Sequence, residues 1–527
     1  MSETKQNTQD SKNRRQARAI QERQAKKKLR ITTVIVVAVL VILVAGALLL
    51  NSNFLRRSVS VIKVGGRGFS ATEYDFFFNS SYQEFRQMVE SQGYTAYIPL
   101  PDANRPLASQ IYDTETGETW SEYIGELTFN RLTEFVQYSD AAAQAGYVLS
   151  EEDRSTMRTE IEYMKSIAAS SEGITSFDQF LQNVYGKSIN EEIYTEICEF
   201  VYTVSSYCRD YRDALVYTDE QKKDYYSSTS DMLDVFSFRY ITVSMESVSS
   251  SDYETDEEYQ AARSESIAAA LAAADEMAAG INSEDDFITA ARTYNESTYG
   301  DDSSTRREYM GEMLGDIYGP WLRESERSYN DVTSVEMSNG AYVVYFIGRE
   351  NNDYEMLSMR QLLLMRQEIN TDDFELGADD PAYEEAFDLV DRMARERGVA
   401  ALSLFEDGGA TEELLIELMA EHSDDTTDGA FYENISKYYY SSDSTQSLKL
   451  VPEIEEWLFE EGRQVGDYEL IRSEAYGYHL VYFTGESGKF CDFIADDRMR
   501  TDDYTGWVES LPKHDASKTW AFILTQR

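Results

Sequence analysis

Apolar residues form one unbroken run near the start of the chain and recur with a helix or strand period after it. Residues 31–50, ITTVIVVAVLVILVAGALLL, carry no charge, and a helix of that length spans the roughly 30 Å hydrocarbon core of a bilayer. Residues 58–64 alternate like a short strand, and the GGRG that follows predicts a turn. From residue 70 to about 217 apolar side chains recur every three or four positions, which predicts an all-helical domain.

The period changes at Asp234, where alternating β-branched and aromatic residues predict a strand and the start of a new domain. The elements expected there are a strand at 235–243, helices at 256–279 and 283–294, and a closing strand at 341–346. The same order of elements is then repeated, with a strand at 354–364, helices at 381–398, 411–421 and 451–459, and strands at 468–471 and 478–483. Each copy has the order β-α-α-loop-α-β-β, which predicts two tandem α+β domains.

The expected fold class is therefore α+β, with a single N-terminal transmembrane helix, an all-helical domain and two tandem α+β domains. The expected segments are a basic tail at 1–30, the transmembrane helix at 31–50, the helical domain at 58–233, the two α+β domains at 234–350 and 354–487, and a C-terminal helix and tail at 488–527. The last apolar run, residues 520–524, must be buried, and the helical domain or the strand that follows the membrane helix offers a place for it.

The charges that flank the apolar run predict its orientation in the membrane. Residues 1–30 hold ten Lys or Arg against three Asp or Glu, and positive flanks stay on the cytoplasmic side. We expect a single-pass cell-membrane protein with a cytoplasmic N-terminus and an extracytoplasmic remainder, as at a Gram-positive cell surface. A cleaved signal peptide is the alternative, but its apolar region would be about 7 to 15 residues long and end in a small-x-small site.

The rest of the chain is strongly acidic. Without the first 30 residues, the totals of 48 basic and 96 acidic side chains fall to 38 and 93, a formal charge near −55. Nucleic acid and anionic lipid are poor partners for such a surface, whereas basic peptide stretches are attracted to it. Three cysteines are too few for a disulfide scaffold, and with three scattered histidines we expect no metal or other cofactor.

Three motifs in the second α+β domain carry chemistry. In chain order they are Ser423-Asp424-Asp425 at a helix end, Leu450-Val-Pro-Glu-Ile-Glu-Glu456 at a helix start, and Gly477-Tyr478-His479 in the closing strand. Together they resemble the parvulin, or rotamase, family of peptidyl-prolyl isomerases. Residues 58 to about 511 are also similar to extracytoplasmic foldases of the SurA and PrsA kind, in which a helical chaperone domain accompanies parvulin domains.

The resemblance implies a role for six residues of the second domain. The implied catalytic residues are His479, Asp425 and Gln361, and the implied substrate-binding residues are Leu450, Ile454 and Phe431. Asp425 would lie beside the twisting carbonyl, and Leu450 and Ile454 would hold the proline ring where the family usually has Met and Phe. Gln361 stands where the family has a second histidine, and we expect it to hydrogen-bond to His479. A buried core histidine remains an equal interpretation of His479.

The first α+β domain departs further from the family pattern. Tyr240 follows Arg239, residues 295–297 read Asn-Glu-Ser, and the closing strand reads Gly340-Ala341-Tyr342 without histidine. We interpret this domain as parvulin-shaped and peptide-binding, without catalysis.

The resulting hypothesis is a membrane-anchored foldase that isomerises peptidyl-prolyl bonds in secreted or surface proteins. Its partners would be unfolded or proline-containing polypeptides and the membrane. The alternative is a non-catalytic holdase chaperone, or a surface scaffold, whose parvulin-shaped domains only bind peptides.

Overall fold

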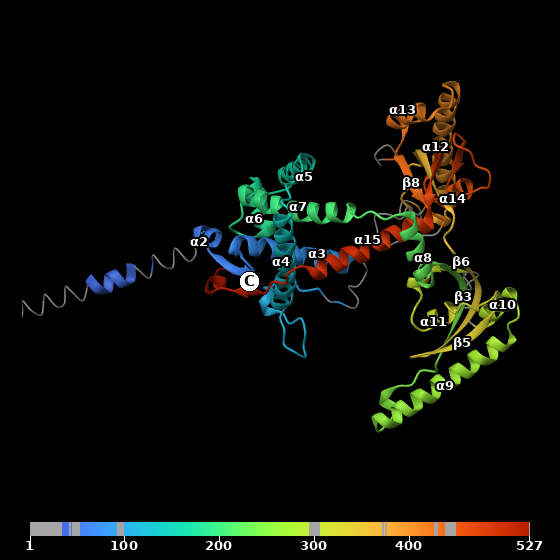
Figure 1. Ribbon diagram of the computed structural model, residues 1–527, viewed down its shortest axis with the longest axis horizontal. Helices are drawn as coiled ribbons and strands as arrows, with labels where there is room; N and C mark the ends of the chain where they lie inside the picture. Colours follow the sequence, from blue (N-terminus) through green and yellow to red (C-terminus); the bar gives the residue numbers. More distant parts are fainter. Residues whose placement is uncertain are drawn as a thin grey trace, which may run out of the picture. The chain divides into compact units, whose positions relative to one another are not determined.

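A computed structural model describes residues 34–41, 44, 53–91, 98, 100–294, 306–371, 374, 377–425, 430–437 and 450–525. The chain forms two units, which are drawn in Figure 1. Unit 1 consists of Met1–Leu215 and Asp503–Arg527, and unit 2 consists of Val216–Asp502. The described residues form a mixed α+β fold with three small sheets.

The predicted transmembrane helix and the predicted membrane location are wrong. Of residues 31–50 the structure describes 34–41 and 44, which are helical, and the remainder lies outside the described residues, as does the basic tail at 1–30. Within the described ranges, no helix is both long enough and apolar enough to cross a bilayer. A crossing requires about 20 apolar residues in one helix.

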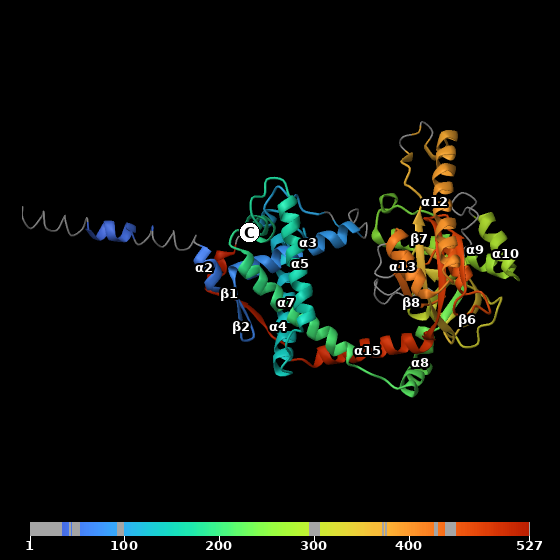
Figure 2. The same ribbon diagram turned by 90° about the horizontal axis from the view of Figure 1, so that it is seen from above.

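Unit 1 is mainly helical, and several of its helices begin at residues whose side chains satisfy free backbone N–H groups. Thr119 forms a capping box with Glu122, and the side chains of Ser150, Ser176 and Asn190 cap the next three helices. Figure 2 shows α3, α4, α5 and α7 gathered in this unit. The helices are α2 (Asn53–Ser58), α3 (Ala71–Ser91), α4 (Trp120–Gln144), α5 (Glu151–Ser170), α6 (Phe177–Tyr185) and α7 (Glu191–Asp213), with a short 3-10 helix η2 (Leu107–Ser109).

The end of the chain completes the core of unit 1. Strand β11 (Ala516–Lys518) pairs with β1 (Ser60–Val64), which pairs in turn with β2 (Arg67–Ser70). The 3-10 helix η8 (Trp520–Leu524) follows, and its Ala521 and Leu524 are buried in the same apolar cluster as β1 and α3. The predicted burial of residues 520–524 against the helical segment and the first strand is therefore confirmed for these two side chains. It is wrong for Trp520 and Ile523, which are 78% and 81% exposed.

Unit 2 contains two four-stranded sheets with the same strand order. The first has the order β4-β3-β6-β5 and the second β8-β7-β10-β9. Their strands are β3 (Val235–Ser244), β4 (Arg307–Met310), β5 (Val332–Met337), β6 (Gly340–Glu350), β7 (Glu355–Met365), β8 (Phe431–Ile435), β9 (Tyr468–Arg472) and β10 (Gly477–Lys489). The α-helices of unit 2 are α8 (Asp219–Leu233), α9 (Asp256–Gly280), α10 (Glu284–Tyr294), α11 (Gly319–Leu322), α12 (Pro381–Asp407), α13 (Glu412–His422), α14 (Pro452–Leu458) and α15 (Phe490–Ser510). The last of these, α15, ends in unit 1. The 3-10 helices of unit 2 are η3 (Ser250–Asp252), η4 (Gly311–Met313) and η6 (Gly377–Asp379).

The order of elements differs from the prediction at one point in each copy. The segment predicted as a loop after the second helix holds a strand, β4 in the first copy and β8 in the second. Each is an edge strand of four or five residues, too short to give a clear alternating pattern.

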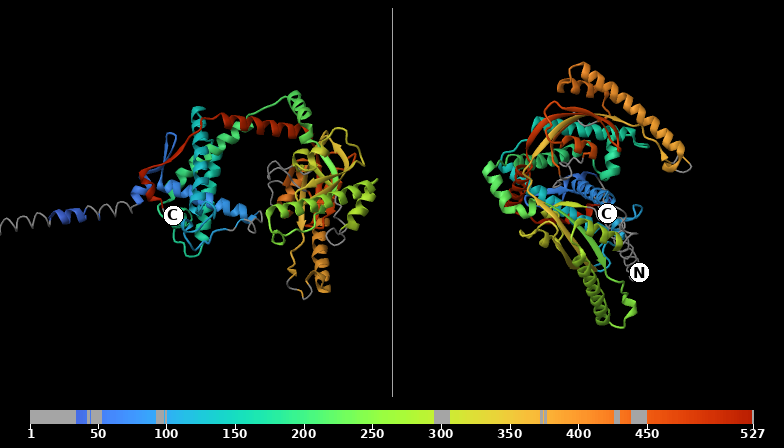
Figure 3. Two further views of the ribbon diagram at one scale, coloured as in Figure 1. Left: turned by 90° about the horizontal axis from the view of Figure 1, so that it is seen from below. Right: turned by 90° about the vertical axis from the view of Figure 1, so that its right-hand side faces the viewer.

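The second sheet has two covered faces. Leu362, Leu364 and Leu480 lie on one face with α12 and α13, while Met359, Val481 and Phe483 lie on the other with α14. The split follows from strand geometry, because successive side chains point to opposite faces. Figure 3 shows the long orange helix α12 continuing beyond the end of this sheet.

A glycine begins the closing strand of each sheet for a steric reason. Gly477 has φ +143°, and a Cβ there would lie 2.5 Å from the carbonyl oxygen of Leu364. Gly340 has φ +148°, and its Cβ would lie 2.1 Å from the carbonyl oxygen of Val243. Both positions therefore exclude any side chain.

Substituting Gly477→Ala is expected to lower the free energy of unfolding of unit 2 by about 1–3 kcal/mol, because it combines backbone strain with a backbone clash. Gly488→Ala is the matched control in the same strand, since Gly488 has φ +108° but open space around it. Urea unfolding of the two variants measures the difference. Equal losses would show that the close approach to Leu364 is unimportant.

Candidate active site

The site is built on the face of the second sheet that α14 covers. In β10, His479, Val481 and Phe483 alternate with residues of the opposite face. In β7, Gln361 is on the same face, because it pairs directly with Val481. The strand pairing thus places one polar side chain from each central strand beside an apolar cluster.

A continuous chain of hydrogen bonds crosses this face. The Oγ of Ser473 lies 2.8 Å from Nε2 of His479, and Nδ1 of His479 lies 3.1 Å from Oε1 of Gln361. The Nε2 of Gln361 donates to Oδ2 of Asp425 at 2.9 Å and to the hydroxyl of Tyr432 at 3.0 Å. Tyr432 in turn donates its hydroxyl proton to Asp425. The predicted hydrogen bond between Gln361 and His479 is therefore confirmed.

The partners fix the tautomer of His479. A carbonyl oxygen can only accept, so Nδ1 carries the proton and donates it to Gln361. Nε2 then accepts from the hydroxyl of Ser473, whose oxygen also accepts from the backbone N–H groups of Tyr476 and Gly477. Every bond in the chain then runs in one direction, from Ser473 to the carboxylate of Asp425.

The end of helix α13 positions Asp425. The Oγ of Ser423 accepts from the backbone N–H of Leu363 at 3.1 Å and from that of Asp425 at 3.2 Å. The backbone N–H of Asp424 donates to the carbonyl oxygen of Leu363 at 2.8 Å. These bonds attach the Ser-Asp-Asp segment to β7, so the carboxylate of Asp425 reaches Gln361 in that strand.

The hydrogen-bond chain runs from a buried end at Ser473 to a more exposed end at Asp425. Ser473 and His479 are 0% and 2% exposed, whereas Gln361, Asp425 and Tyr432 are half-buried. Burial lowers the pKa of His479 to about 4, despite the opposing charges of Glu453 and Asp425. His479 is therefore neutral at pH 7, as its two hydrogen bonds require.

The depressed pKa of His479 predicts acid sensitivity. An unfolded histidine binds its proton near pH 6.5 and the folded one near pH 4, so the unfolded state binds more protons in that window. Stability should thus fall as the pH drops from 6.5 to 4, by about 2–3 kcal/mol from this group. Urea unfolding at both pH values, compared with His479→Asn, separates this contribution from that of the carboxylates. An equal pH dependence in both proteins would contradict it.

The residues predicted to bind substrate fall into two groups. Leu450 and Ile454 are 9% and 2% exposed. They pack with Met359 and Trp457 in the apolar cluster on the same face of the sheet as the hydrogen-bond chain. Phe431 is 38% exposed and lies on the opposite face of the sheet, because it pairs with Arg360, whose guanidinium lies 4.5 Å from the ring centroid. The structure therefore brings five of the six predicted residues to one face and leaves Phe431 apart.

Sequence reasoning missed Tyr432 and Ser473. Tyr432 pairs with Met359 in the register of β7 and β8, which puts its side chain on the face of Gln361. Tyr432 follows the predicted residue Phe431 directly. A change of one residue in strand register exchanges the faces of two such neighbours, so the sequence did not show which of them lies beside Gln361. Nothing in the sequence around Ser473 marks it as a partner of His479.

The first sheet has aromatic side chains at the matching positions. Tyr240 and Tyr342 stand where the second sheet has Gln361 and His479, with their ring centroids 5.4 Å apart. Tyr318 lies 5.7 Å from Tyr240 and 5.5 Å from Tyr342. The three tyrosines form a half-buried aromatic cluster in place of the polar chain. Residues 295–297, the acidic position expected from the sequence, lie outside the described residues.

Within the part of the chain that the structure describes, no group of three or more His, Cys, Asp or Glu side chains gathers as metal ligands would. The hydrogen-bond chain holds the neutral imidazole of His479 near its buried end and the carboxylate of Asp425 at its open end, beside apolar side chains.

Comparison with known proteins gives structural neighbours only. No family model matches the chain, and no curated protein matches it. Solved structures similar to it include the peptidylprolyl isomerase PrsA from Bacillus anthracis (12% identity, 55% of this chain and 94% of that one, TM-score 0.22) and from Bacillus cereus (13%, 65% and 97%, TM-score 0.24). PrsA from Bacillus subtilis is a third (13% identity, 59% and 91%, TM-score 0.14).

Proposed function

We propose that the second sheet catalyses cis–trans isomerisation of peptidyl-prolyl bonds in polypeptide clients. The observation that carries this proposal is the directed hydrogen-bond chain from Ser473 through His479 and Gln361 to Asp425, next to the apolar cluster of Leu450 and Ile454. It supports an enzyme that needs neither a nucleophile nor a metal.

The reaction sets modest chemical demands. Rotation about an X-Pro bond crosses about 18–20 kcal/mol and takes tens to hundreds of seconds unaided. The barrier is the loss of amide resonance, so a site accelerates rotation when it stabilises the twisted amide more than the planar one. Fixed charges and dipoles with little exposure to water do this at no cost of reorganisation.

Asp425 is the residue we assign to the twisting amide. A twisted amide loses resonance, its carbonyl carbon becomes more electron-poor, and a nearby anion stabilises that state. Gln361 and Tyr432 both donate to Oδ2 of Asp425, which holds the carboxylate in place. His479 acts one step away as a positioning residue, because its Nδ1–H fixes the orientation of the Gln361 amide.

A refolding assay tests the proposal, and Tyr342, which stands in the first sheet where His479 stands in the second, provides the control. The full-length protein is added to a client whose refolding is limited by one X-Pro bond, and the refolding rate is measured. The expected result is an acceleration that His479→Ala reduces and Tyr342→Ala in the first sheet leaves unchanged. A refolding rate equal to the uncatalysed one, with no effect of His479→Ala, would refute the enzyme.

A non-catalytic holdase is the second candidate, and the first sheet favours it. There the polar chain is replaced by Tyr240, Tyr318 and Tyr342, side chains suited to contact with apolar segments. A holdase suppresses aggregation of an unfolded client without changing its rate of X-Pro isomerisation. Light scattering by a denatured client, measured beside the refolding assay, distinguishes the two functions.

A further inference from the structure

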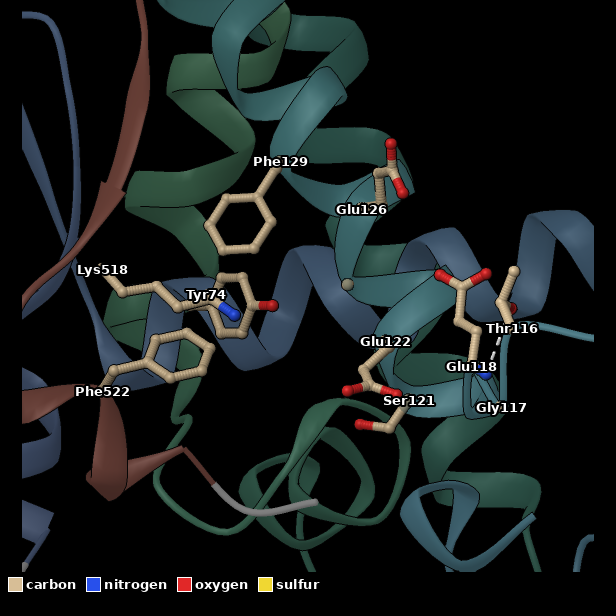
Figure 4. Close-up of a pocket in the computed structure, with 11 residues that line it drawn as sticks. Tyr74, Thr116, Gly117, Glu118, Ser121, Glu122, Glu126, Phe129, Lys518 and Phe522 are labelled. Carbon is tan, nitrogen blue, oxygen red and sulfur yellow. Dashed lines mark hydrogen bonds between the residues drawn. The ribbon is translucent and has the colours of Figure 1, made fainter. Parts of the chain in front are cut away.

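Unit 1 contains a cavity of about 610 Å³ whose two ends differ in chemistry. Figure 4 shows Tyr74, Phe129, Phe522 and Lys518 at one end, and Glu118, Glu122 and Glu126 toward the other. The size lies within the usual range of sites that hold a ligand or a short peptide segment. The cavity lies outside the sheet proposed to be catalytic.

Three aromatic rings form the apolar end. The ring centroid of Tyr74 lies 5.9 Å from that of Phe129 and 5.4 Å from that of Phe522. These rings come from α3, α4 and η8, so the cavity exists only because the end of the chain returns to β1. The rings offer contact area to an apolar side chain.

The acidic end lies along the start of α4. Glu122 and Glu126 are four residues apart and share one face of α4, while Glu118 lies just before the N-cap Thr119. Hydrogen bonds from the backbone N–H and hydroxyl of Thr119 lower the pKa of Glu122. Gly125 also lines the cavity, and it brings no side chain into the space between the glutamates.

The chain itself places a cation in this cavity. The ammonium of Lys518 lies 5.2 Å from the ring centroid of Phe129 and 4.7 Å from that of Phe522. Its register opposite Ile62 in the β1–β11 pair holds it there. Three carboxylates and one ammonium still leave a formal charge of −2 on the lining. The cavity therefore matches a ligand that adds positive charge beside an apolar group.

We propose that this cavity binds an extended polypeptide segment in which an apolar or aromatic side chain is followed by an arginine or lysine. The apolar side chain contacts the rings of Phe129 and Phe522, which pack on the buried ring of Tyr74, and the cationic side chain lies against Glu118 and Glu126. This inference deepens the proposed handling of unfolded clients by naming the segments that unit 1 selects. It rests on that function but not on catalysis by the second sheet.

The test uses the full-length protein and a peptide without proline, so its outcome is independent of isomerisation. The probe is a glycine-serine peptide with one phenylalanine followed by one arginine, carrying a neutral dye whose fluorescence anisotropy reports binding. Two matched probes replace arginine by citrulline, which is neutral and of similar shape, or phenylalanine by alanine. The double substitution Glu118→Gln and Glu126→Gln removes two charges from the cavity, and Glu115→Gln with Glu134→Gln removes two that do not line it.

The unmodified protein is expected to bind the arginine peptide. In the variant with Glu118→Gln and Glu126→Gln the Kd rises about tenfold, since each exposed charge contributes up to about 1 kcal/mol. The control variant changes the Kd less than twofold, and both altered probes bind more weakly to the unmodified protein. Equal binding of the arginine and citrulline peptides, or equal loss in the two variants, would overturn the proposal. If binding holds but X-Pro isomerisation is absent, the site stands and the catalytic function fails.

Discussion

Asp425→Asn is expected to slow catalysed prolyl isomerisation about ten- to a hundredfold. Asparagine retains an oxygen that accepts from Gln361 and Tyr432, so the change removes the negative charge and preserves the hydrogen bonds. A loss of that size corresponds to about 1.4–2.7 kcal/mol of transition-state stabilisation. The rate constant for a short X-Pro peptide, measured at pH 7 with saturating enzyme, tests the prediction.

Asp388→Asn is the matched control for charge. Asp388 is an exposed residue of α12 in the same unit, and the substitution changes the net charge equally. We expect it to leave the rate unchanged. Equal effects of the two substitutions would mean that Asp425 acts only through the general field of an acidic protein.

Arg56→Met is expected to destabilise unit 1 by about 3–5 kcal/mol, the second large effect. The side chains of Arg56 and Asp75 are 7% and 8% exposed, and they form an ion pair in the interior. Arg56 also donates to Oγ of Ser188 at 3.2 Å and to the carbonyl oxygen of Leu524. Methionine fills similar space but leaves the carboxylate of Asp75 in the core without its guanidinium, and loses the link to the end of the chain.

Hydrogen exchange of the α3 amides under increasing urea reports the stability of unit 1 in the full chain. Arg86→Met serves as a control in the same helix, because Arg86 pairs with Glu90 at 2.8 Å on the exposed surface and such pairs add little. Protection of α3 that is equal in both variants would contradict a structural role for the buried pair.

The elements of unit 2 could be predicted well where a residue type determines them locally. Thr411 caps α13, and the predicted helix at 411–421 matches Glu412–His422. The end of α12 was predicted at Gly398, and this was wrong, because the helix continues to Asp407. Gly398 is there for packing: a Cβ would lie 3.1 Å from a methyl carbon of Leu470. A glycine that permits close packing has the same sequence signal as one that ends a helix.

The candidate site could be predicted only as far as its family motifs reach. They identified His479, Gln361 and Asp425, which the structure joins in one hydrogen-bond chain. The contribution of Tyr432 depends on the pairing of β8 with β7, and such a register is a tertiary property. The rings around Lys518 were equally hidden, because they meet only when β11 pairs with β1, more than 400 residues away along the chain.

The central claim is that the second sheet rotates X-Pro bonds, and exchange NMR of a proline peptide with the full-length protein tests it most directly. We expect cis–trans exchange faster than in the free peptide, with line broadening confined to residues beside the proline. We expect this exchange to be reduced by His479→Ala and retained in Tyr342→Ala, at the matching position of the first sheet. An exchange rate identical to that of the free peptide, at protein concentrations where the peptide is bound, would contradict it.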